Sequence, residues 1–240
     1  MTRNVGVTET LVDLRPEWTV DVFAAATALG DWKVLVAVCG LFCLADVYRT
    51  VRRGEPDDGV CADRTAFLVA VVFGGIALAL LLKSLFEAPR PPEELHAITP
   101  SDDGFPSGHT MVATVGWGAL AWWGIRESRR LRVAAVGVAI SVVALSRLAL
   151  GVHFLVDVLA AVGFGGLYLV AVAWTIEDRP LAAFALAFVL ASGAAVASGG
   201  STRGVLAVVG TVLVLGAWQV IEFPPVRRRL GRVGGRRVRP

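Results

Sequence analysis

Residues 146–157 read SRLALGVHFLVD and place an arginine, a histidine and an aspartate between two long apolar runs. A charged side chain at the centre of a bilayer costs roughly 2.5–3.5 kcal/mol, so polar groups retained in apolar sequence indicate a functional site. His153 and Asp157 are four residues apart, and this spacing predicts that both lie on one face of a helix within hydrogen-bond reach. A carboxylate that holds one imidazole nitrogen leaves the other nitrogen free to act as a nucleophile or a base.

The rest of the chain is apolar enough to lie in a membrane. Its 240 residues are 55% hydrophobic and have a mean hydropathy of +0.67, which is too apolar for an ordinary soluble domain. Long apolar runs recur along it, and about 20 helical residues cross a hydrocarbon core of roughly 30 Å. This pattern predicts an all-α, polytopic membrane helix bundle with about six to seven transmembrane helices.

Seven apolar runs fit transmembrane helices. We expect these helices at residues 32–48, 65–86, 107–125, 133–148, 153–176, 181–198 and 205–221. The stretch 18–29 is too short and too charged to span, so it predicts an interfacial helix within an N-terminal segment of residues 1–31. The transmembrane domain is expected over residues 32–222, and a basic tail over residues 223–240.

Basic residues are distributed unequally between the two sides of the predicted bundle. Each predicted helix crosses the membrane once, so alternate loops lie on the same side. The loops at 49–64, 126–132 and 177–180 share one side with the tail, and together they hold 16 of the 23 lysine and arginine residues. Cytoplasmic loops collect basic residues, so these segments are expected in the cytoplasm of the cell and the acidic loop at 87–106 outside it. The seven arginines of the tail suit the anionic headgroups of the inner leaflet, and nucleic acid is not expected as a partner.

Polar groups from four predicted helices and their loops meet at the outer face of this bundle. Alternate helix ends share a side of the membrane, and the ends that face outward carry Lys83, Arg90, Ser107, Gly108, His109, Arg147 and His153. Three cations around two imidazoles suit a dianionic tetrahedral ligand, because arginine binds phosphate oxygens bidentately and lysine acts as a point charge. A helix start at Ser107 and Gly108 adds backbone donors, and glycine lets an anion approach closely.

Three motifs hold these residues. They read Lys83-x6-Arg90-Pro91, Pro106-Ser107-Gly108-His109 and Ser146-Arg147-x5-His153-x3-Asp157. Together, in order and spacing and at every motif position, they resemble the signature motifs of the type 2 phosphatidic acid phosphatase superfamily. Members of this superfamily are membrane phosphatases of lipid phosphates and isoprenoid diphosphates. The resemblance covers residues 83–157 directly, and residues 1–60 and 178–240 carry no motif.

The resemblance implies a role for each motif residue. It makes His153 the nucleophile that forms a phosphohistidine, Asp157 the carboxylate that orients it, and His109 the general acid that later activates water. The phosphate-binding groups that it implies are Lys83, Arg90, Ser107, Gly108 and Arg147, within a four-helix catalytic core of about residues 65–176. Positive charges take the place of a metal ion, so no metal and no cofactor are expected. The implied function is metal-independent hydrolysis of a lipid phosphate or isoprenoid diphosphate drawn from the surrounding membrane lipids.

Two other functions stay open on the sequence. A lipid phosphotransferase would use the same histidine pair with an alcohol in place of water. A non-catalytic transporter or scaffold could keep a phosphate pocket, although the chain shows no corresponding halves with broken helices. Taken singly, Lys83 and Arg90 could snorkel at helix ends, and His153 with Asp157 could join two helices. The three motifs together favour catalysis, but they specify neither the lipid nor the oligomeric state.

Overall fold

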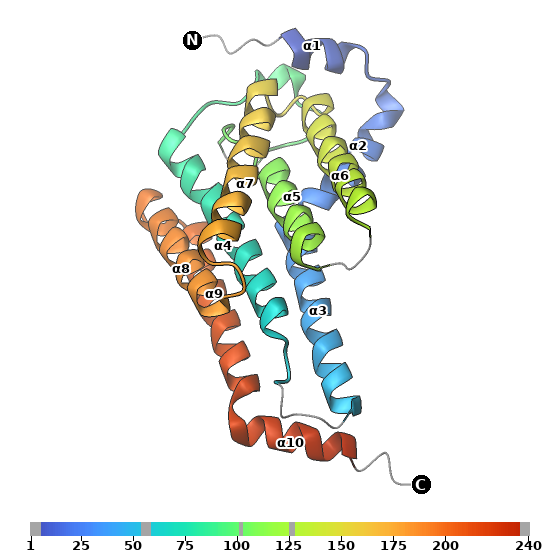
Figure 1. Cartoon of the computed structure of the whole chain (residues 1–240). Helices are drawn as coiled ribbons and strands as arrows, with labels where there is room; N and C mark the ends of the chain where they lie inside the picture. The colour runs from blue at the N-terminus through green and yellow to red at the C-terminus, as the bar shows by residue number, and fades with distance from the viewer. Residues whose placement is uncertain (1–5, 54–58, 101–102, 125–127, 236–240) are drawn as a thin grey trace.

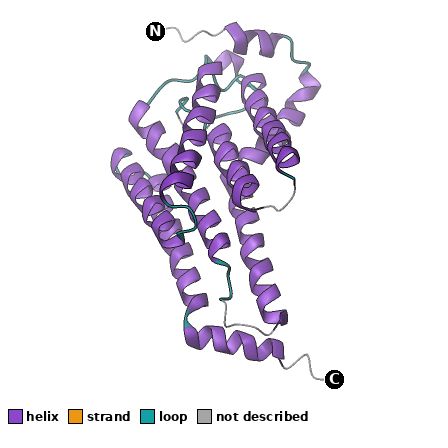
Figure 2. Ribbon diagram, viewed as in Figure 1, coloured by secondary structure: helices purple, strands orange, loops and turns teal. Residues whose placement is uncertain are grey.

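The computed structural model describes residues 6–53, 59–100, 103–124 and 128–235. Over these residues the chain is all helical, with ten α-helices, several short turns of other helix types and no strand (Figures 1 and 2). The all-α membrane bundle expected from the sequence is therefore confirmed.

Two short helices come first, seven helices form the bundle, and a short helix ends the described chain. In order they are α1 Gly6–Asp13, α2 Val20–Thr27, α3 Trp32–Arg53, α4 Asp63–Phe86, α5 Gly108–Ala119, α6 Arg129–Ala149, α7 Leu155–Thr175, α8 Pro180–Ala197, α9 Thr202–Glu222 and α10 Pro224–Gly235. Within the described residues, six helices are long and apolar enough to cross a membrane: α3, α4, α6, α7, α8 and α9. The expected third span is shorter than the others, because α5 has 12 residues and continues as a π-helical turn over Leu120–Gly124.

Helix α4 is the centre of the bundle. Of its apolar stretch 67% is buried, whereas the corresponding stretches of α3 and α9 are only 11% buried. Two adjacent glycines let neighbouring helices come close to it. A Cβ on Gly74 would overlap the hydroxyl of Tyr168 on α7. A Cβ on Gly75 would overlap Val115 on α5. The packing of α5 and α7 against α4 therefore depends on these two positions.

The end of α4, the start of α5, the end of α6 and the start of α7 meet at one end of the bundle. This end is uppermost in Figure 1 and also carries α1, whereas α10 lies at the opposite end. Loop hydrogen bonds hold the upper end together. The amide of Ala97 donates to the Leu150 carbonyl at 3.0 Å, and the amide of Gly104 donates to the Ala88 carbonyl at 2.7 Å. The loop between α4 and α5 is thereby folded back onto the turn between α6 and α7.

His153 lies just before α7 and not on it. The helix begins at Leu155, with Phe154 as its N-cap, because the chain reverses at Gly151. Gly151 has a φ of 72°, and a Cβ there would overlap the carbonyl oxygen of Leu95. The expectation that His153 and Asp157 share a helix face was therefore wrong for His153, which the turn supplies instead.

The described residues outside the bundle form short helices. Around residues 18–29, the α-helix is confined to α2 and is flanked by 3₁₀ turns at Glu17–Thr19 and Ala28–Gly30. This segment packs against α6 and reaches α5, and its assignment as an interfacial helix stays a prediction. The basic tail forms α10, which contacts α3 and lies across the lower end of the bundle (Figure 1). The domain boundaries at residues 31 and 222 stay a prediction.

Candidate active site

A cluster of buried polar side chains occupies the upper end of the bundle. His153 is 1% exposed and Asp157 is fully buried. Lys83, Ser107 and Arg147 are also buried, while Arg90, Gly108 and His109 are partly buried. All eight residues predicted as a site therefore lie at this one end. Charged groups withdrawn from water need close polar partners, and the contacts around His153 supply them.

Asp157 joins the start of α7 to His153. Its Oδ2 atom lies 3.4 Å from His153 Nδ1, which is long for an N–H···O hydrogen bond. The same oxygen accepts a hydrogen bond of 2.9 Å from the amide of Phe154. Its backbone carbonyl accepts a hydrogen bond of 3.0 Å from the amide of Ser107, at the N-cap of α5. Asp157 thus caps its own helix and ties the starts of α5 and α7 together.

Arg90 faces the other ring nitrogen of His153. Its NH1 group is 3.1 Å from His153 Nε2 and donates a 2.6 Å hydrogen bond to the carbonyl of Val152. A guanidinium has no acceptor, so Nε2 must be the acceptor of this pair. The proton of the neutral imidazole then sits on Nδ1, facing the Asp157 carboxylate. This tautomer leaves the imidazole lone pair on Nε2.

The surroundings of His153 favour the neutral imidazole. This residue lies between the membrane-spanning helices, and burial is the main cause that holds the pKa of its imidazole well below its ordinary value. The neighbouring cations lower that pKa further, in the order Arg90, Arg147 and Lys83, and a backbone hydrogen bond with Gly104 opposes them. Protonation removes the lone pair of an imidazole, and this environment disfavours the protonated form of His153.

Lys83 and the start of α5 form a second wall of the cluster. Lys83 Nζ donates a 2.6 Å hydrogen bond to the Asp103 carbonyl. A Cβ on Gly108 would lie 3.1 Å from Lys83 Cε, so glycine at this position gives the lysine room. Ser107 Oγ is 3.0 Å from Thr110 Oγ1 and makes no side-chain cap to the helix. The Ser107 side chain therefore does not cap the first turn of α5, and a helix N-terminus of this kind favours an anion.

Three residues of the N-terminal segment also touch this cluster. Thr8, Thr27 and Gly30 come from the N-terminal segment and contact His153, Arg147 and His109, respectively. The sequence shows no motif around them, and their burial becomes visible only in the folded chain.

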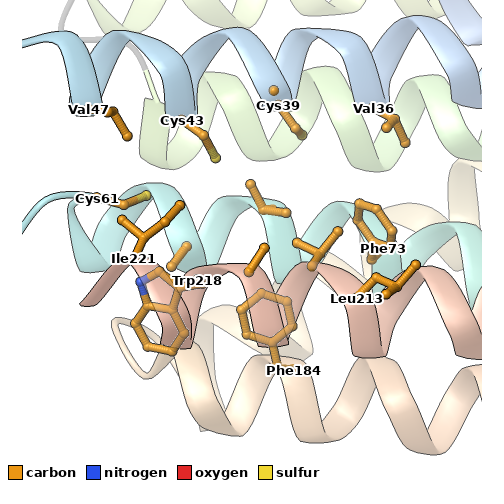
Figure 3. A pocket seen from close by; sticks show the side chains of 15 residues that line it. Val36, Cys39, Cys43, Val47, Cys61, Phe73, Phe184, Leu213, Trp218 and Ile221 are labelled. Atoms are coloured by element: carbon orange, nitrogen blue, oxygen red, sulfur yellow. The ribbon is translucent and has the colours of Figure 1, made fainter. Parts of the chain in front are cut away.

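A separate apolar cavity lies between α3, α4, α8 and α9. It has a volume of about 400 Å³, and Figure 3 shows Cys39, Cys43, Phe73, Phe184 and Trp218 among the side chains around it. Its lining carries no carboxylate, imidazole or cationic group, and three free thiols are its polar side chains besides the Trp218 indole. Among the described residues, no group of three or more histidine, cysteine or acidic side chains could hold a metal ion.

Comparisons with known proteins agree with this architecture. Residues 64–181 match the sequence profile of the PAP2 superfamily, a range that includes all three motifs and excludes the N-terminal segment. A solved crystal structure, of a transmembrane PAP2-type phosphatidylglycerolphosphate phosphatase from Bacillus subtilis, is similar with a TM-score of 0.62 and 24% identity. The match covers 72% of this chain and 84% of that one, and it shows a shared fold. No curated protein sequence matches the chain.

Proposed function

The chain belongs to the PAP2 superfamily, and we propose that it is an integral membrane phosphatase that hydrolyses a lipid phosphate or isoprenoid diphosphate through a phosphohistidine at His153. One observation carries this proposal. The buried imidazole of His153 has a carboxylate at Nδ1 and a guanidinium at Nε2, so a phosphate drawn to the guanidinium arrives beside the nucleophilic nitrogen.

In the first step, Nε2 of His153 forms a bond to phosphorus while the bond from phosphorus to the leaving oxygen breaks. The phosphate displaces Nε2 as the partner of Arg90, which frees the lone pair for attack. His109, at the first turn of α5, donates a proton to the leaving alkoxide or phosphate. The positive charge that develops on the imidazole is stabilised by Asp157 through the Nδ1 proton, as a carboxylate does for other nucleophilic histidines.

Positive charge stabilises the transition state. Lys83, Arg90 and Arg147 surround His153 closely enough to depress its proton affinity, and the same field attracts the equatorial oxygens of a five-coordinate phosphorus. Amides at the start of α5 add donors on another side. Preorganised electrostatics of this kind often supply the largest share of catalysis. They act here in a buried site, where each charge is felt more strongly than in water.

In the second step, His109 acts as a base. It takes a proton from water, the water oxygen bonds to phosphorus, and the bond from phosphorus to Nε2 breaks. Inorganic phosphate leaves, and the lone pair of His153 is restored. The same residue therefore gives a proton in one half of the cycle and takes one in the other.

The substrate is a lipid because the site is enclosed in a bundle of membrane helices. The Bacillus subtilis protein of the same fold is a phosphatidylglycerolphosphate phosphatase, which makes that lipid the first candidate for this chain. Phosphatidic acid and a polyprenyl diphosphate complete the panel to be tested. Purified protein in detergent should release inorganic phosphate from at least one of the three lipids. Release from none would contradict the proposal, and a new phosphate ester with no free phosphate would indicate a transferase.

Removing the charge of Arg90 should change the pH dependence of the reaction. We expect the acid limb of kcat/KM in Arg90→Gln to lie at higher pH than in the wild type, because loss of a neighbouring cation raises the pKa of His153. Arg90→Lys keeps the charge and serves as the matched control, with its acid limb close to that of the wild type. The same substrate is used for every variant, so ionisation of the substrate affects the acid limb of each profile equally. An unchanged limb in Arg90→Gln would contradict the assignment of His153.

The site is proposed to face outward, with α10 in the cytoplasm, because basic residues concentrate at the opposite end of the bundle. In a background with the native cysteines replaced by alanine, Glu94→Cys should react with an impermeant maleimide added to intact cells. Arg228→Cys should react only after permeabilisation. Both positions are exposed in the folded chain. The opposite labelling pattern would place the site in the cytoplasm.

A further inference from the structure

The N-terminal residues 6–30, here called the outer segment, lie outside the family match yet touch residues of the second and third motifs. The segment comprises α1, α2 and the turns around them. Figure 1 shows α1 above the upper ends of α6 and α7, and α2 beside α6. Two of its contacts with the buried polar cluster are hydrogen bonds and one is a close backbone approach. Each of the three involves a different motif residue.

Thr8 is the first contact. It is the one buried residue of α1, and its Oγ1 donates a 3.0 Å hydrogen bond to the backbone carbonyl of His153. Close by, Arg15 NH1 donates a 2.7 Å hydrogen bond to the carbonyl of Ala149 at the end of α6. The outer segment therefore holds the backbone on both sides of the turn that presents the imidazole. That turn is not part of a helix, so its position depends on such contacts.

Thr27 is the second contact. It is the one buried residue of α2, and its Oγ1 accepts a 3.2 Å hydrogen bond from Arg147 NH1. A hydroxyl is a neutral acceptor, so it fixes the direction of the guanidinium and leaves its positive charge intact for a phosphate. A carboxylate at the same place would neutralise that charge.

Gly30 is the third contact. It is buried where the outer segment ends, and a Cβ at this position would overlap the carbonyl oxygen of His109. The obstacle is backbone, which cannot move aside as a flexible side chain does. The end of the outer segment thus lies directly against the first turn of α5, where the proposed general acid sits.

We propose that the outer segment completes the active site, with Thr8 and Thr27 as positioning residues for His153 and Arg147. The proposal rests on the function proposed above. Thr27 directs the Arg147 guanidinium toward the phosphate, and Thr8 fixes the turn that aims Nε2 at phosphorus. Neither residue touches the substrate, and each acts through a hydrogen bond to one motif residue.

Replacing the two threonines should therefore change different kinetic constants. In Thr27→Val, we expect KM and the inhibition constant for inorganic phosphate to rise about tenfold, because a hydrogen bond to a charged group is lost. In Thr8→Val, we expect kcat to fall about fivefold while both of those constants stay unchanged, because phosphate binding is left intact. Thr27→Ser and Thr8→Ser keep the hydroxyl and should restore wild-type values.

Two other threonines of the outer segment serve as controls. Thr10 and Thr19 donate to the carbonyls of Gly6 and Pro16 within their own turns, and both hydrogen bonds are exposed. Thr10→Val and Thr19→Val should match the wild type in kcat and KM. The proposal is overturned if the two test variants match these controls, if serine fails to restore activity, or if only the yield of folded protein falls. A wild-type protein that hydrolyses no lipid phosphate would instead remove the proposed function itself.

Discussion

Replacement of His153 with alanine should lower phosphate release by about a thousandfold or more, to background. The variant lacks the nitrogen that we propose bonds to phosphorus, so no phosphoenzyme should form with any substrate. Phosphate binding should persist, because the cations around the site remain in place. Initial rates of phosphate release, and protection by vanadate against thermal unfolding, measure the two properties separately.

His96→Ala is the matched control, because His96 is the one histidine of the chain outside the motifs. It lies partly buried in the loop between α4 and α5, and its removal should leave kcat within a few-fold of the wild type. A His153→Ala protein that retained turnover, or that lost turnover only in parallel with folding, would show that His153 is structural.

Replacement of His109 with alanine should separate substrates by their leaving groups. Cleavage of an alkyl lipid phosphate should fall about 10²- to 10⁴-fold, because the alkoxide needs a proton as it departs. An aryl phosphate with an acidic phenol needs little help, so it should still phosphorylate His153. Water is then no longer activated, and the phosphoenzyme should accumulate. A burst of phenol followed by slow turnover is the kinetic signature expected.

Equal losses with both kinds of substrate would contradict this division of labour. So would accumulation of phosphoenzyme in the wild type and not in His109→Ala. The comparison is informative because His109 is partly exposed at the start of α5 and His153 is fully enclosed, so the two imidazoles differ in access to water as well as in role.

The convergence of the motif residues could be predicted because it follows from helix parity alone. Lys83 and Arg147 come at the ends of helices, and His109 comes at a start, so any bundle with these spans brings them to one end. The number of spans was less certain, because a π turn at Leu120–Gly124 ends the third apolar run early. Apolar composition cannot reveal such a turn.

The placement of His153 could not be predicted from spacing. His153 and Asp157 are four positions apart, and this spacing equally suits a helix face and a turn that leads into a helix N-terminus. Gly151, in a conformation with positive φ, selects the turn. Asp157 then binds the amide of Phe154 as well as facing the imidazole. A carboxylate three residues after an N-cap suits both functions.

The contacts of the outer segment are the part of the site that could not be predicted from the sequence, and the reason is physical. Thr8, Thr27 and Gly30 act through single hydrogen bonds or through the absence of a side chain, and such effects leave no periodic pattern in a sequence. The apolar side chains of α1 and α2 are at most partly buried, so the two helices have no fully buried apolar face that hydrophobicity could predict. Only the spatial arrangement shows which backbone groups these residues meet.

Identification of the phosphorylated atom tests the central claim most directly. The protein should be quenched in base during turnover of an aryl phosphate by His109→Ala, then digested and mapped by mass spectrometry with phosphohistidine isomer standards. The account predicts phosphate on Nε2 of His153, because Nδ1 carries the proton that faces Asp157. Phosphate on Nδ1, phosphate on another residue, or no phosphoenzyme under conditions of a phenol burst would contradict it.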